Sequence, residues 1–402
     1  MKFGIIKERK SPPDSRVVFA PETLQKAQQQ FPDVTFVVET SAIRVFSDQE
    51  YRDAGFEVSD DITDCDVLIG VKEVPIAALI PNKKYFFFSH TIKKQPYNRK
   101  LLQTILKKNI ELFDHETLVA ANGNRLLGFG YYAGIVGAYN AIRTLGMLDD
   151  IFELPKAASL KDKKALLAVL DNVKLSAIKI VLSGTGRVGG GAKEILDYLG
   201  VKEVSVAAYL SKTYDAPVYV QLNALDYNAR NDGEAATLKH FFENPTAYKS
   251  TFMQFAAVST VFIAGHFYGQ GAPYLFTKED AKSEDFNIRL VADISCDIDG
   301  PVASTIRAAT IADPIYGYDP VSESEVAFGS SGSIAVMAVD NLPCELPRDA
   351  SQGFGTVFLE KVLPAFFNND ADSVLERARM TQKGRLTPKF AYLQDYVNKT
   401  NT

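Results

Sequence analysis

Short apolar runs alternate with helical patterns over the first 130 or so residues. The runs Thr35–Val38, Val67–Val71 and Tyr85–Phe88 have the length and the β-branched or aromatic content of buried strands. Between such runs, residues 98–108 place Leu and Ile at helical spacing and Lys on the opposite face. Strands that alternate with helices predict a parallel sheet covered by helices.

A glycine-rich turn follows a further apolar run, Ala177–Leu182. Gly184, Gly186 and Gly189 have the spacing GxGxxG, and the turn opens into an amphipathic helical pattern. In this setting the first glycine permits the tight turn, the second lets the backbone approach a pyrophosphate, and the third lets helix and strand pack closely. A purely structural turn is the alternative. The expected dinucleotide contacts are Gly184, Gly186, Arg187, Val188 and Gly189.

The two strand regions predict two domains. A helical pattern over residues 133–145 carries the chain from the first region to the second, and the last sixty residues show no core of their own. The fold class is therefore α/β, with two Rossmann-like domains, parallel sheets and an active-site cleft between the domains. Residues 1–135 plus 345–402 are expected to form a discontinuous substrate or catalytic domain, and residues 136–344 the dinucleotide-binding domain.

The strand after the glycine turn bears on the choice between NAD and NADP. Residues 204–210 read as that strand, and a fold selective for NAD carries an acidic residue at its end to hold the ribose 2′-hydroxyl. Ser211 and Lys212 stand there instead, and their hydroxyl and ammonium groups suit a 2′-phosphate. The sequence leaves NAD and NADP both open as the cofactor and favours NADP.

Composition excludes several classes of partner. The net charge of −5 is spread over interleaved acidic and basic residues, which disfavours nucleic-acid binding. Cys65, Cys296 and Cys344 have neither metal-ligand spacing nor a disulfide pattern, so no metal is expected. The apolar stretch 251–265 is shorter than the roughly 20 residues of a membrane span, and the first residues do not read as a signal peptide. We expect a cytoplasmic protein with a small-molecule substrate, and either a monomer or a dimer is compatible with the sequence.

Two ionisable residues follow buried strands of the first region. Lys72 and His90 are expected at carboxyl ends of parallel strands, where ligands gather, although a surface lysine and a hydrogen-bonded histidine are an equal alternative. Asp297 follows another apolar run and is expected near a nicotinamide, with turn chemistry as the alternative because Asp299 and a glycine come next. Packing or surface roles are expected for His115, His240 and His266.

The block Ser89–Gln95 resembles the lysine-forming saccharopine dehydrogenases. It is also similar to the lysine-ketoglutarate reductase half of the bifunctional aminoadipate semialdehyde synthases and, more distantly, to alanine dehydrogenase. The matching blocks follow the family's order over most of the chain. They are Lys7–Glu8 with Arg16 and Pro21–Glu22, Gly70–Lys72, the block around His90, Phe129–Gly134, the glycine turn, Asp293–Asp297 and Val339–Pro343.

The resemblance implies an NAD(P)-dependent oxidoreductase that acts on a CH–NH group and interconverts saccharopine with L-lysine and 2-oxoglutarate. It assigns acid–base chemistry to Lys72 and His90. Guanidinium groups suit this substrate because saccharopine presents three carboxylates that arginine binds bidentately. The implied substrate contacts are Arg16, Gln95, Arg125 and Phe129, and the implied nicotinamide contacts are Asp297 and Asn341.

Other functions remain open at this point. An alanine dehydrogenase-like enzyme is disfavoured by the spacing of His90, Lys93 and Gln95. A dehydrogenase for another opine-type secondary-amine dicarboxylate would use the same chemistry. A catalytically silent NAD(P)-binding regulator is a further alternative, which the intact pair of Lys72 and His90 disfavours. Asn124 precedes Arg125 where some relatives carry a second arginine, so one carboxylate contact differs here.

Overall fold

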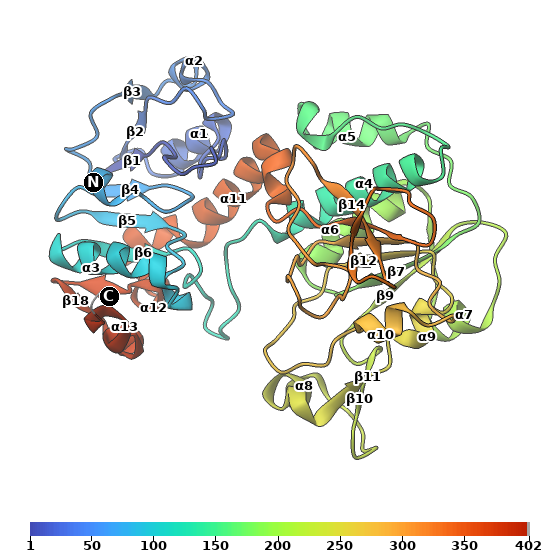
Figure 1. Cartoon of the computed structure of the whole chain (residues 1–402). Helices are drawn as coiled ribbons and strands as arrows, with labels where there is room; N and C mark the ends of the chain where they lie inside the picture. The colour runs from blue at the N-terminus through green and yellow to red at the C-terminus, as the bar shows by residue number, and fades with distance from the viewer. Residues whose placement is uncertain (400–402) are drawn as a thin grey trace. The chain divides into compact units, whose positions relative to one another are not determined.

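The computed structural model describes residues 1–399 and divides into two compact units (Figure 1). Met1–Phe129 and the residues from Pro347 onward form unit 1, and Gly130–Leu346 form unit 2. Residues 400–402, which the expected substrate domain includes, lie outside the described residues. Both units combine a sheet with helices, so the predicted α/β class is confirmed.

Unit 1 is built on a six-stranded sheet in which all neighbours are parallel. The strand order β3-β2-β1-β4-β5-β6 is the order of a dinucleotide-binding fold. The strands at the middle of the sheet coincide with the apolar runs of the sequence. Their bounds are β1 Lys2–Ile5, β2 Thr35–Glu39, β3 Glu57–Ser59, β4 Val67–Ile69, β5 Lys84–Phe87 and β6 Glu111–Asp114.

Two hydrophobic cores lie on the two faces of this sheet. In β4, Val67 and Ile69 belong to one core and Leu68 belongs to the other, because successive strand residues point to opposite faces. Helices α1, α11 and α12 contribute to the first core, and α3 and α13 contribute to the second. The helices of unit 1 are α1 Pro21–Gln30, α2 Asp48–Asp53, α3 Arg99–Lys107, α11 Pro347–Lys361, α12 Val374–Ala378 and α13 Gln394–Asn398.

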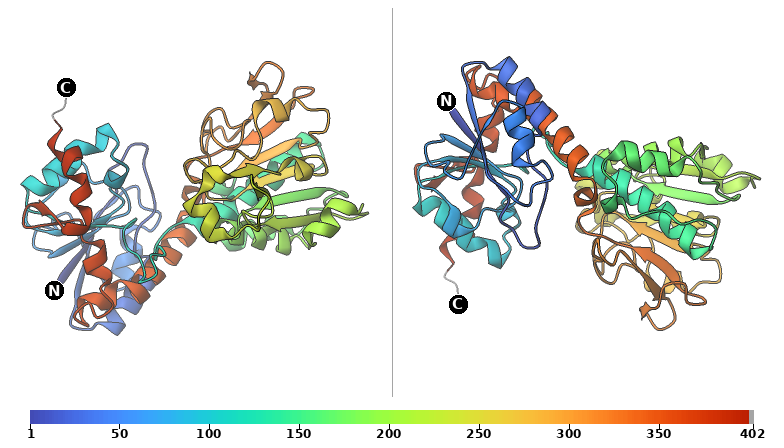
Figure 2. Two further views of the ribbon diagram at one scale, coloured as in Figure 1. Left: turned by 90° about the horizontal axis from the view of Figure 1, so that it is seen from below. Right: turned by 90° about the horizontal axis from the view of Figure 1, so that it is seen from above.

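The C-terminal residues complete unit 1. In both views of Figure 2 the red C-terminal helices lie among the blue and cyan elements. The Val17 N–H donates to Ser351 Oγ of α11 at 3.0 Å. The Leu112 N–H of β6 donates to Thr381 Oγ1 at 2.9 Å. Thr381 lies in the short hairpin of β17 (Thr381–Gln382) and β18 (Arg385–Leu386).

Unit 2 contains an eight-stranded mixed sheet in the order β15-β14-β16-β13-β12-β7-β9-β8. The strands from β16 to β8 are parallel, but β14 is antiparallel to both β15 and β16. The prediction of a purely parallel second sheet is therefore wrong at this edge. The bounds are β7 Lys179–Ser183, β8 Lys202–Glu203, β9 Val218–Leu222, β12 Val261–Ala264, β13 Leu290–Asp293, β14 Ile315–Asp319, β15 Ser324–Val326 and β16 Ile334–Met337.

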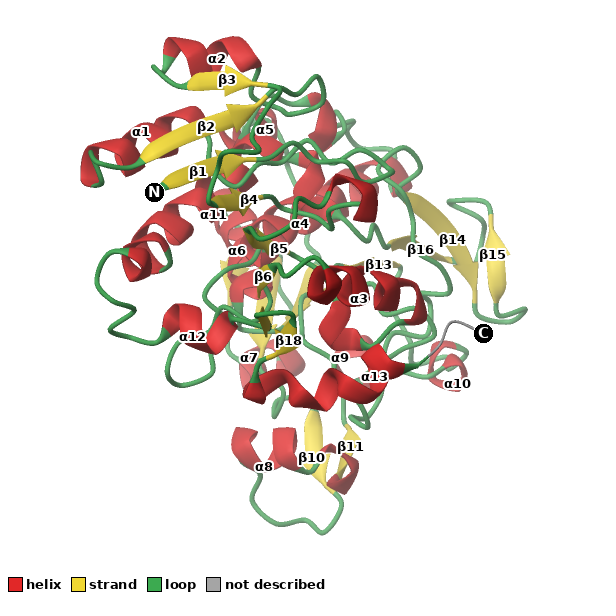
Figure 3. Cartoon of the chain, turned by 90° about the vertical axis from the view of Figure 1, so that its left-hand side faces the viewer, coloured by secondary structure: helices red, strands yellow, loops and turns green. Residues whose placement is uncertain are grey.

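Helices and a small hairpin complete unit 2. The long helix α4 and the helix α6 after the glycine turn both pack on one core of this sheet. Figure 3 shows α8 beside the antiparallel hairpin of β10 (Asn228–Arg230) and β11 (Tyr248–Ser250). The helices are α4 Gly130–Leu148, α5 Lys163–Leu170, α6 Arg187–Tyr198, α7 Val206–Ser211, α8 Leu238–Glu243, α9 Met253–Ala256 and α10 Lys278–Ala281.

The strand predicted at residues 204–210 is wrong. Most of this segment is the helix α7, and the Ser205 side chain caps its first turn by accepting from the Ala208 N–H at 3.3 Å. A capping serine followed by two alanines favours a helix despite the valines on either side. The strand beside β7 is β9, which begins at Val218.

Over residues 1–399, no helix is both long and apolar enough to cross a membrane. Within the same range, no group of three or more His, Cys, Asp or Glu side chains is arranged to hold a metal ion. The three cysteines are free thiols.

Candidate functional site

Lys72 and His90 follow the carboxyl ends of β4 and β5, which are neighbours in the unit 1 sheet. The Glu8 carboxylate accepts the backbone N–H of Val71 at 2.6 Å and of Lys72 at 2.8 Å. Burial raises the pKa of Glu8 to about 7, against the opposing effect of these two donors. The bonds hold the backbone at Lys72 and place a carboxyl group that titrates near neutrality next to it.

His90 is held by Glu73, a residue that the sequence analysis missed. Its Nδ1 lies 2.5 Å from Glu73 Oε1, and Lys10 Nζ donates to the other carboxylate oxygen at 3.1 Å. Burial raises the pKa of Glu73, but the hydrogen bond with His90, a backbone hydrogen bond, the His90 charge and the Lys10 hydrogen bond together outweigh burial and lower the pKa to about 2. The pair holds the imidazole through Nδ1, and Nε2 is the ring nitrogen that Glu73 does not contact. An acidic residue directly after Lys72 was the available signal.

Arg16, Arg125 and Phe129 gather around the Phe88 ring. The Arg16 guanidinium lies 4.2 Å from the Phe129 ring centre, and that of Arg125 lies 5.4 Å from the Phe88 ring centre. The Phe88 ring centroid is 6.2 Å from that of Phe129 and also 6.2 Å from that of His90. Three of the predicted substrate residues therefore share one neighbourhood with His90.

The Arg16 charge is already matched by Asp14. Arg16 Nε donates to Asp14 Oδ1 at 3.0 Å and Nη2 donates to Oδ2 at 2.6 Å, with both side chains buried. Burial raises the pKa of Asp14, but the hydrogen bond and the charge of Arg16 outweigh it and lower the pKa overall. A substrate carboxylate would have to approach the N–H groups of Arg16 that Asp14 does not use.

Gln95 and His115 are two further residues of unit 1 for which the sequence predicts a role. Gln95 is exposed, and its backbone carbonyl accepts the Tyr396 hydroxyl at 2.5 Å. Among residues 1–399 it makes no hydrogen bond with the residues around Phe88. His115 is buried with its Nε2 2.8 Å from the Gly70 carbonyl oxygen, and burial lowers its pKa to about 3. His115 therefore packs in the core, as predicted.

In unit 2 the glycine turn joins β7 to the N-terminus of α6. Gly184 has φ +95°, and a Cβ there would overlap the Gly265 carbonyl. A Cβ on Gly189 would overlap the Gly184 carbonyl, whereas one on Gly186 would meet nothing within 4 Å. The turn itself thus requires the first and third glycines, and the second leaves space at a helix N-terminus, where N–H groups attract anions.

A cavity of about 460 Å³ opens at this turn. Arg187 and Val188 of the turn line it together with Asn223 after β9, His266 after β12 and Phe242 of α8. The volume falls within the roughly 300–1,000 Å³ typical of small-molecule sites. Apolar walls near an anion-binding turn suit a ligand that has both aromatic rings and phosphates.

Asn223 stands after β9, where a fold selective for NAD carries an acidic residue. Its backbone N–H and its side-chain amide donate to Asp226 Oδ2 at 2.7 and 2.6 Å. Ser211 ends α7, Lys212 follows it in the exposed loop, and neither lines the cavity. Because the strand was misplaced, the expected contact of Ser211 and Lys212 with a 2′-phosphate has lost its structural basis.

His266 was expected to be a packing or surface residue, yet it lines the cavity. Its Nδ1 lies 2.8 Å from Ser183 Oγ, and its buried Nε2 has no hydrogen-bond partner within the described part of the chain. Burial lowers its pKa to about 4. A neutral imidazole with an unsatisfied nitrogen in a cavity wall is costly unless a ligand pairs with it.

Asp293 has a structural role in unit 2. Its Oδ1 accepts the Ser295 and Cys296 N–H groups at 3.1 Å each, and its Oδ2 accepts the Thr305 hydroxyl at 2.7 Å. Asp297 is exposed, and partial desolvation raises its pKa. The carbonyl of Asn341 accepts the Cys344 N–H at 2.9 Å, at the start of a short 3₁₀ helix. The nicotinamide contacts of Asp297 and Asn341 stay predictions.

Residues 4–136 match the family model described as alanine dehydrogenase/PNT, N-terminal domain. The chain is 29% identical to the mitochondrial alpha-aminoadipic semialdehyde synthase of Rattus norvegicus over 89% of its own length and 44% of that protein. It is 27% identical to the Arabidopsis thaliana enzyme of the same name, of which it covers 37%. The chain therefore spans less than half the length of these relatives.

Two further comparisons extend over most of both chains. A saccharopine dehydrogenase [NAD(+), L-lysine-forming] of Yarrowia lipolytica is 24% identical, with 81% of this chain and 82% of that protein covered. A solved L-alanine dehydrogenase aligns with 99% of this chain and 100% of its own at a TM-score of 0.67 and 18% identity, which shows a common fold. Residues 4–136 thus resemble the alanine dehydrogenase/PNT N-terminal domain, and the resemblance of the chain to saccharopine dehydrogenases and aminoadipic semialdehyde synthases is confirmed.

Proposed function

We propose that this chain is a nicotinamide-dependent dehydrogenase of the CH–NH group that interconverts saccharopine with L-lysine and 2-oxoglutarate. The observation that carries the proposal is the pairing of His90, after β5, with Glu73, next to Lys72 after the neighbouring strand β4. Relatives that are named for saccharopine and aminoadipic semialdehyde chemistry support it across most of the chain.

Unit 1 supplies the acid–base groups in this proposal. Lys72 takes the proton of the secondary amine as the bond from nitrogen to the glutamate-side carbon becomes an imine. His90 delivers and removes protons at Nε2 while water adds to the imine and the adduct collapses to lysine and 2-oxoglutarate. Glu73 keeps the imidazole in one orientation through the contact with Nδ1. Arg16 and Arg125 bind substrate carboxylates, with Phe88 and Phe129 as apolar walls.

Unit 2 supplies the cofactor site in this proposal. The glycine turn and the N-terminus of α6 would hold the pyrophosphate, and His266 Nε2 offers a buried group that a bound nucleotide would satisfy. When bound, the nicotinamide accepts the hydride from the glutamate-side carbon. Asn223 brings no positive charge to the end of β9, whereas Arg187 lines the same cavity, so both NAD and NADP are compatible with this site.

Steady-state assays with the purified chain test the proposal. Saccharopine oxidation and the reductive joining of lysine with 2-oxoglutarate are each followed at the nicotinamide absorbance with both cofactors. We expect turnover of saccharopine and its loss in Lys72→Met, whereas Lys26→Met, on the exposed face of α1, retains it.

The other functions predict different results in the same assays. Turnover of pyruvate plus ammonia with saccharopine untouched would identify an alanine dehydrogenase-like enzyme. Oxidation of other opine-type secondary amines alone would identify a different substrate. Calorimetric binding of a dinucleotide without any turnover would identify a regulator.

A further inference from the structure

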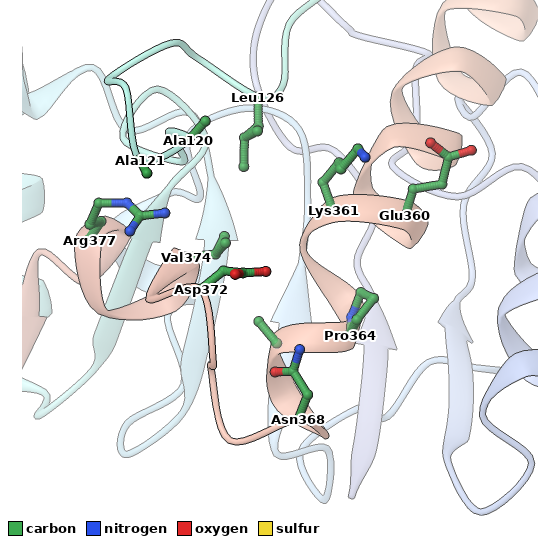
Figure 4. Close-up of a pocket in the computed structure, with 11 residues that line it drawn as sticks. Ala120, Ala121, Leu126, Glu360, Lys361, Pro364, Asn368, Asp372, Val374 and Arg377 are labelled. Atoms are coloured by element: carbon green, nitrogen blue, oxygen red, sulfur yellow. The ribbon is translucent and has the colours of Figure 1, made fainter.

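Unit 1 contains a second cavity, of about 360 Å³, away from Lys72 and His90. The end of α11, the 3₁₀ turn Leu363–Phe366 and α12 line it on one side (Figure 4). A hairpin closed by the bridge between Val119 and Arg125 lines it on the other. Its volume lies in the lower part of the roughly 300–1,000 Å³ range of small-molecule sites.

Charged side chains without ion pairs surround this cavity. Figure 4 shows Arg377 and Lys361 on opposite sides, with the Asp372 carboxylate between them. Arg377 Nε donates to the Val119 carbonyl at 3.2 Å. Within residues 1–399, none of Arg377, Lys361 and Asp372 forms an ion pair with another side chain. Groups of both signs therefore line the cavity without an ion-pair partner among the described residues.

The balance of charge selects the kind of ligand. Lys361 and Arg377 share the cavity wall with the carboxylate of Asp372, whereas Figure 4 shows the Glu360 carboxylate turned away from Asp372. The Asp372 carboxylate would repel one end of a dianion, whereas a zwitterion places each of its charges against an opposite one. The remaining wall is largely aliphatic and includes Leu126, which suits an apolar side chain.

We propose that this cavity binds a free α-amino acid with an aliphatic side chain. The ligand carboxylate would pair with Lys361, and the ammonium group would lie against Asp372. Nothing in this binding step depends on the enzymatic function proposed above.

The cavity shares its hairpin wall with the candidate active site. Ala120, Ala121 and Leu126 line the cavity, and Arg125 of the same hairpin lies over Phe88. A ligand that orders this hairpin would also order Arg125, so occupancy of the cavity would change the affinity for a substrate carboxylate. This coupling step rests on the proposed function.

Isothermal titration calorimetry of the full chain with L-leucine tests the binding step. We expect saturable binding that weakens at least tenfold in Lys361→Gln and in Asp372→Asn. Glu376→Gln, an exposed residue of α12 outside the cavity, is the matched control and should bind as the parent does. Leucinol, which lacks the carboxylate, and isocaproate, which lacks the ammonium group, should both bind at least tenfold more weakly than leucine.

Three outcomes overturn the binding step: no heat with L-leucine, equal binding of isocaproate, or unchanged binding in both cavity variants. Coupling is tested by the KM for saccharopine with and without leucine. A shift in the parent that disappears in Asp372→Asn supports coupling, and leucine binding without a KM shift overturns it. If saccharopine is not turned over at all, the proposed function and the coupling step fail together. The calorimetry still shows whether the cavity binds L-leucine.

Discussion

Glu73→Gln removes the charge beside His90 while it preserves the shape of the side chain. Glu73 has a pKa of about 2 in the folded protein against an ordinary value of 4.5, and its side chain is only 14% exposed. One pKa unit corresponds to about 1.4 kcal/mol, so ionisation of Glu73 stabilises the native state by about 3 kcal/mol. Because the folded value is the lower one, the stabilisation is complete above about pH 5 and is lost as the pH falls through about 2.

Urea unfolding of the parent and of Glu73→Gln over a range of pH measures this effect. The free-energy difference between them should be largest, up to about 3 kcal/mol, near pH 7 and should shrink steadily below about pH 5. Lys10→Gln removes the exposed donor to the other oxygen and should cost less than about 1 kcal/mol. A difference for Glu73→Gln that does not vary with pH would refute the electrostatic reasoning.

The same substitution also tests the role of the pair in catalysis. Charged hydrogen bonds contribute roughly 1.5–3 kcal/mol, so loss of the Glu73 charge should lower kcat/KM for saccharopine roughly 10- to 100-fold. Lys10→Gln again serves as the control and should change kcat/KM only a few-fold. If Glu73→Gln keeps nearly full activity while its stability changes as expected, the carboxylate serves the fold and does not position His90 for the reaction.

Three other substitutions address separate parts of the molecule. Gly189→Ala should abolish the dinucleotide binding that calorimetry measures, because a Cβ there overlaps the Gly184 carbonyl. Gly190→Ala is the control and should bind the dinucleotide normally, since a Cβ there meets nothing within 4 Å. Equal affinities of the two variants would contradict the steric argument. Lys212→Gln should leave the KM for NADPH within about twofold of the parent, since Lys212 lies outside the cavity, and a selective rise for NADPH would restore its predicted role. Asp14→Asn should lower the free energy of unfolding, measured from the urea midpoint, by about 3–5 kcal/mol because it removes the carboxylate charge that pairs with the buried Arg16 guanidinium. A loss below about 1 kcal/mol would contradict this reasoning.

Periodicity predicted the parts of the fold in which local preference and tertiary packing agree. Val67–Ile69 is wholly apolar and is buried on both faces of the sheet, and the apolar run predicted the strand. The glycine turn was equally accessible, since a positive φ at Gly184 and the close approach at Gly189 restrict the residue type. The pairing of Glu73 with His90 could not be predicted in this way, because it depends on the register of two neighbouring strands.

The strand wrongly predicted at residues 204–210 changes which residues are expected to contact the cofactor. The valines at positions 204 and 206 alternate as in a strand. Ser205, however, caps a helix, and Ala207 and Ala208 favour one, so this segment forms α7. The chain therefore reaches its second sheet position only at β9, and the residue that follows is Asn223. That shift moves the question of cofactor choice from an exposed lysine to an uncharged amide in the cavity wall. The contact of Lys212 with a 2′-phosphate stays a prediction, and Asn223 becomes a second residue whose substitution should change the ratio of activities with the two cofactors.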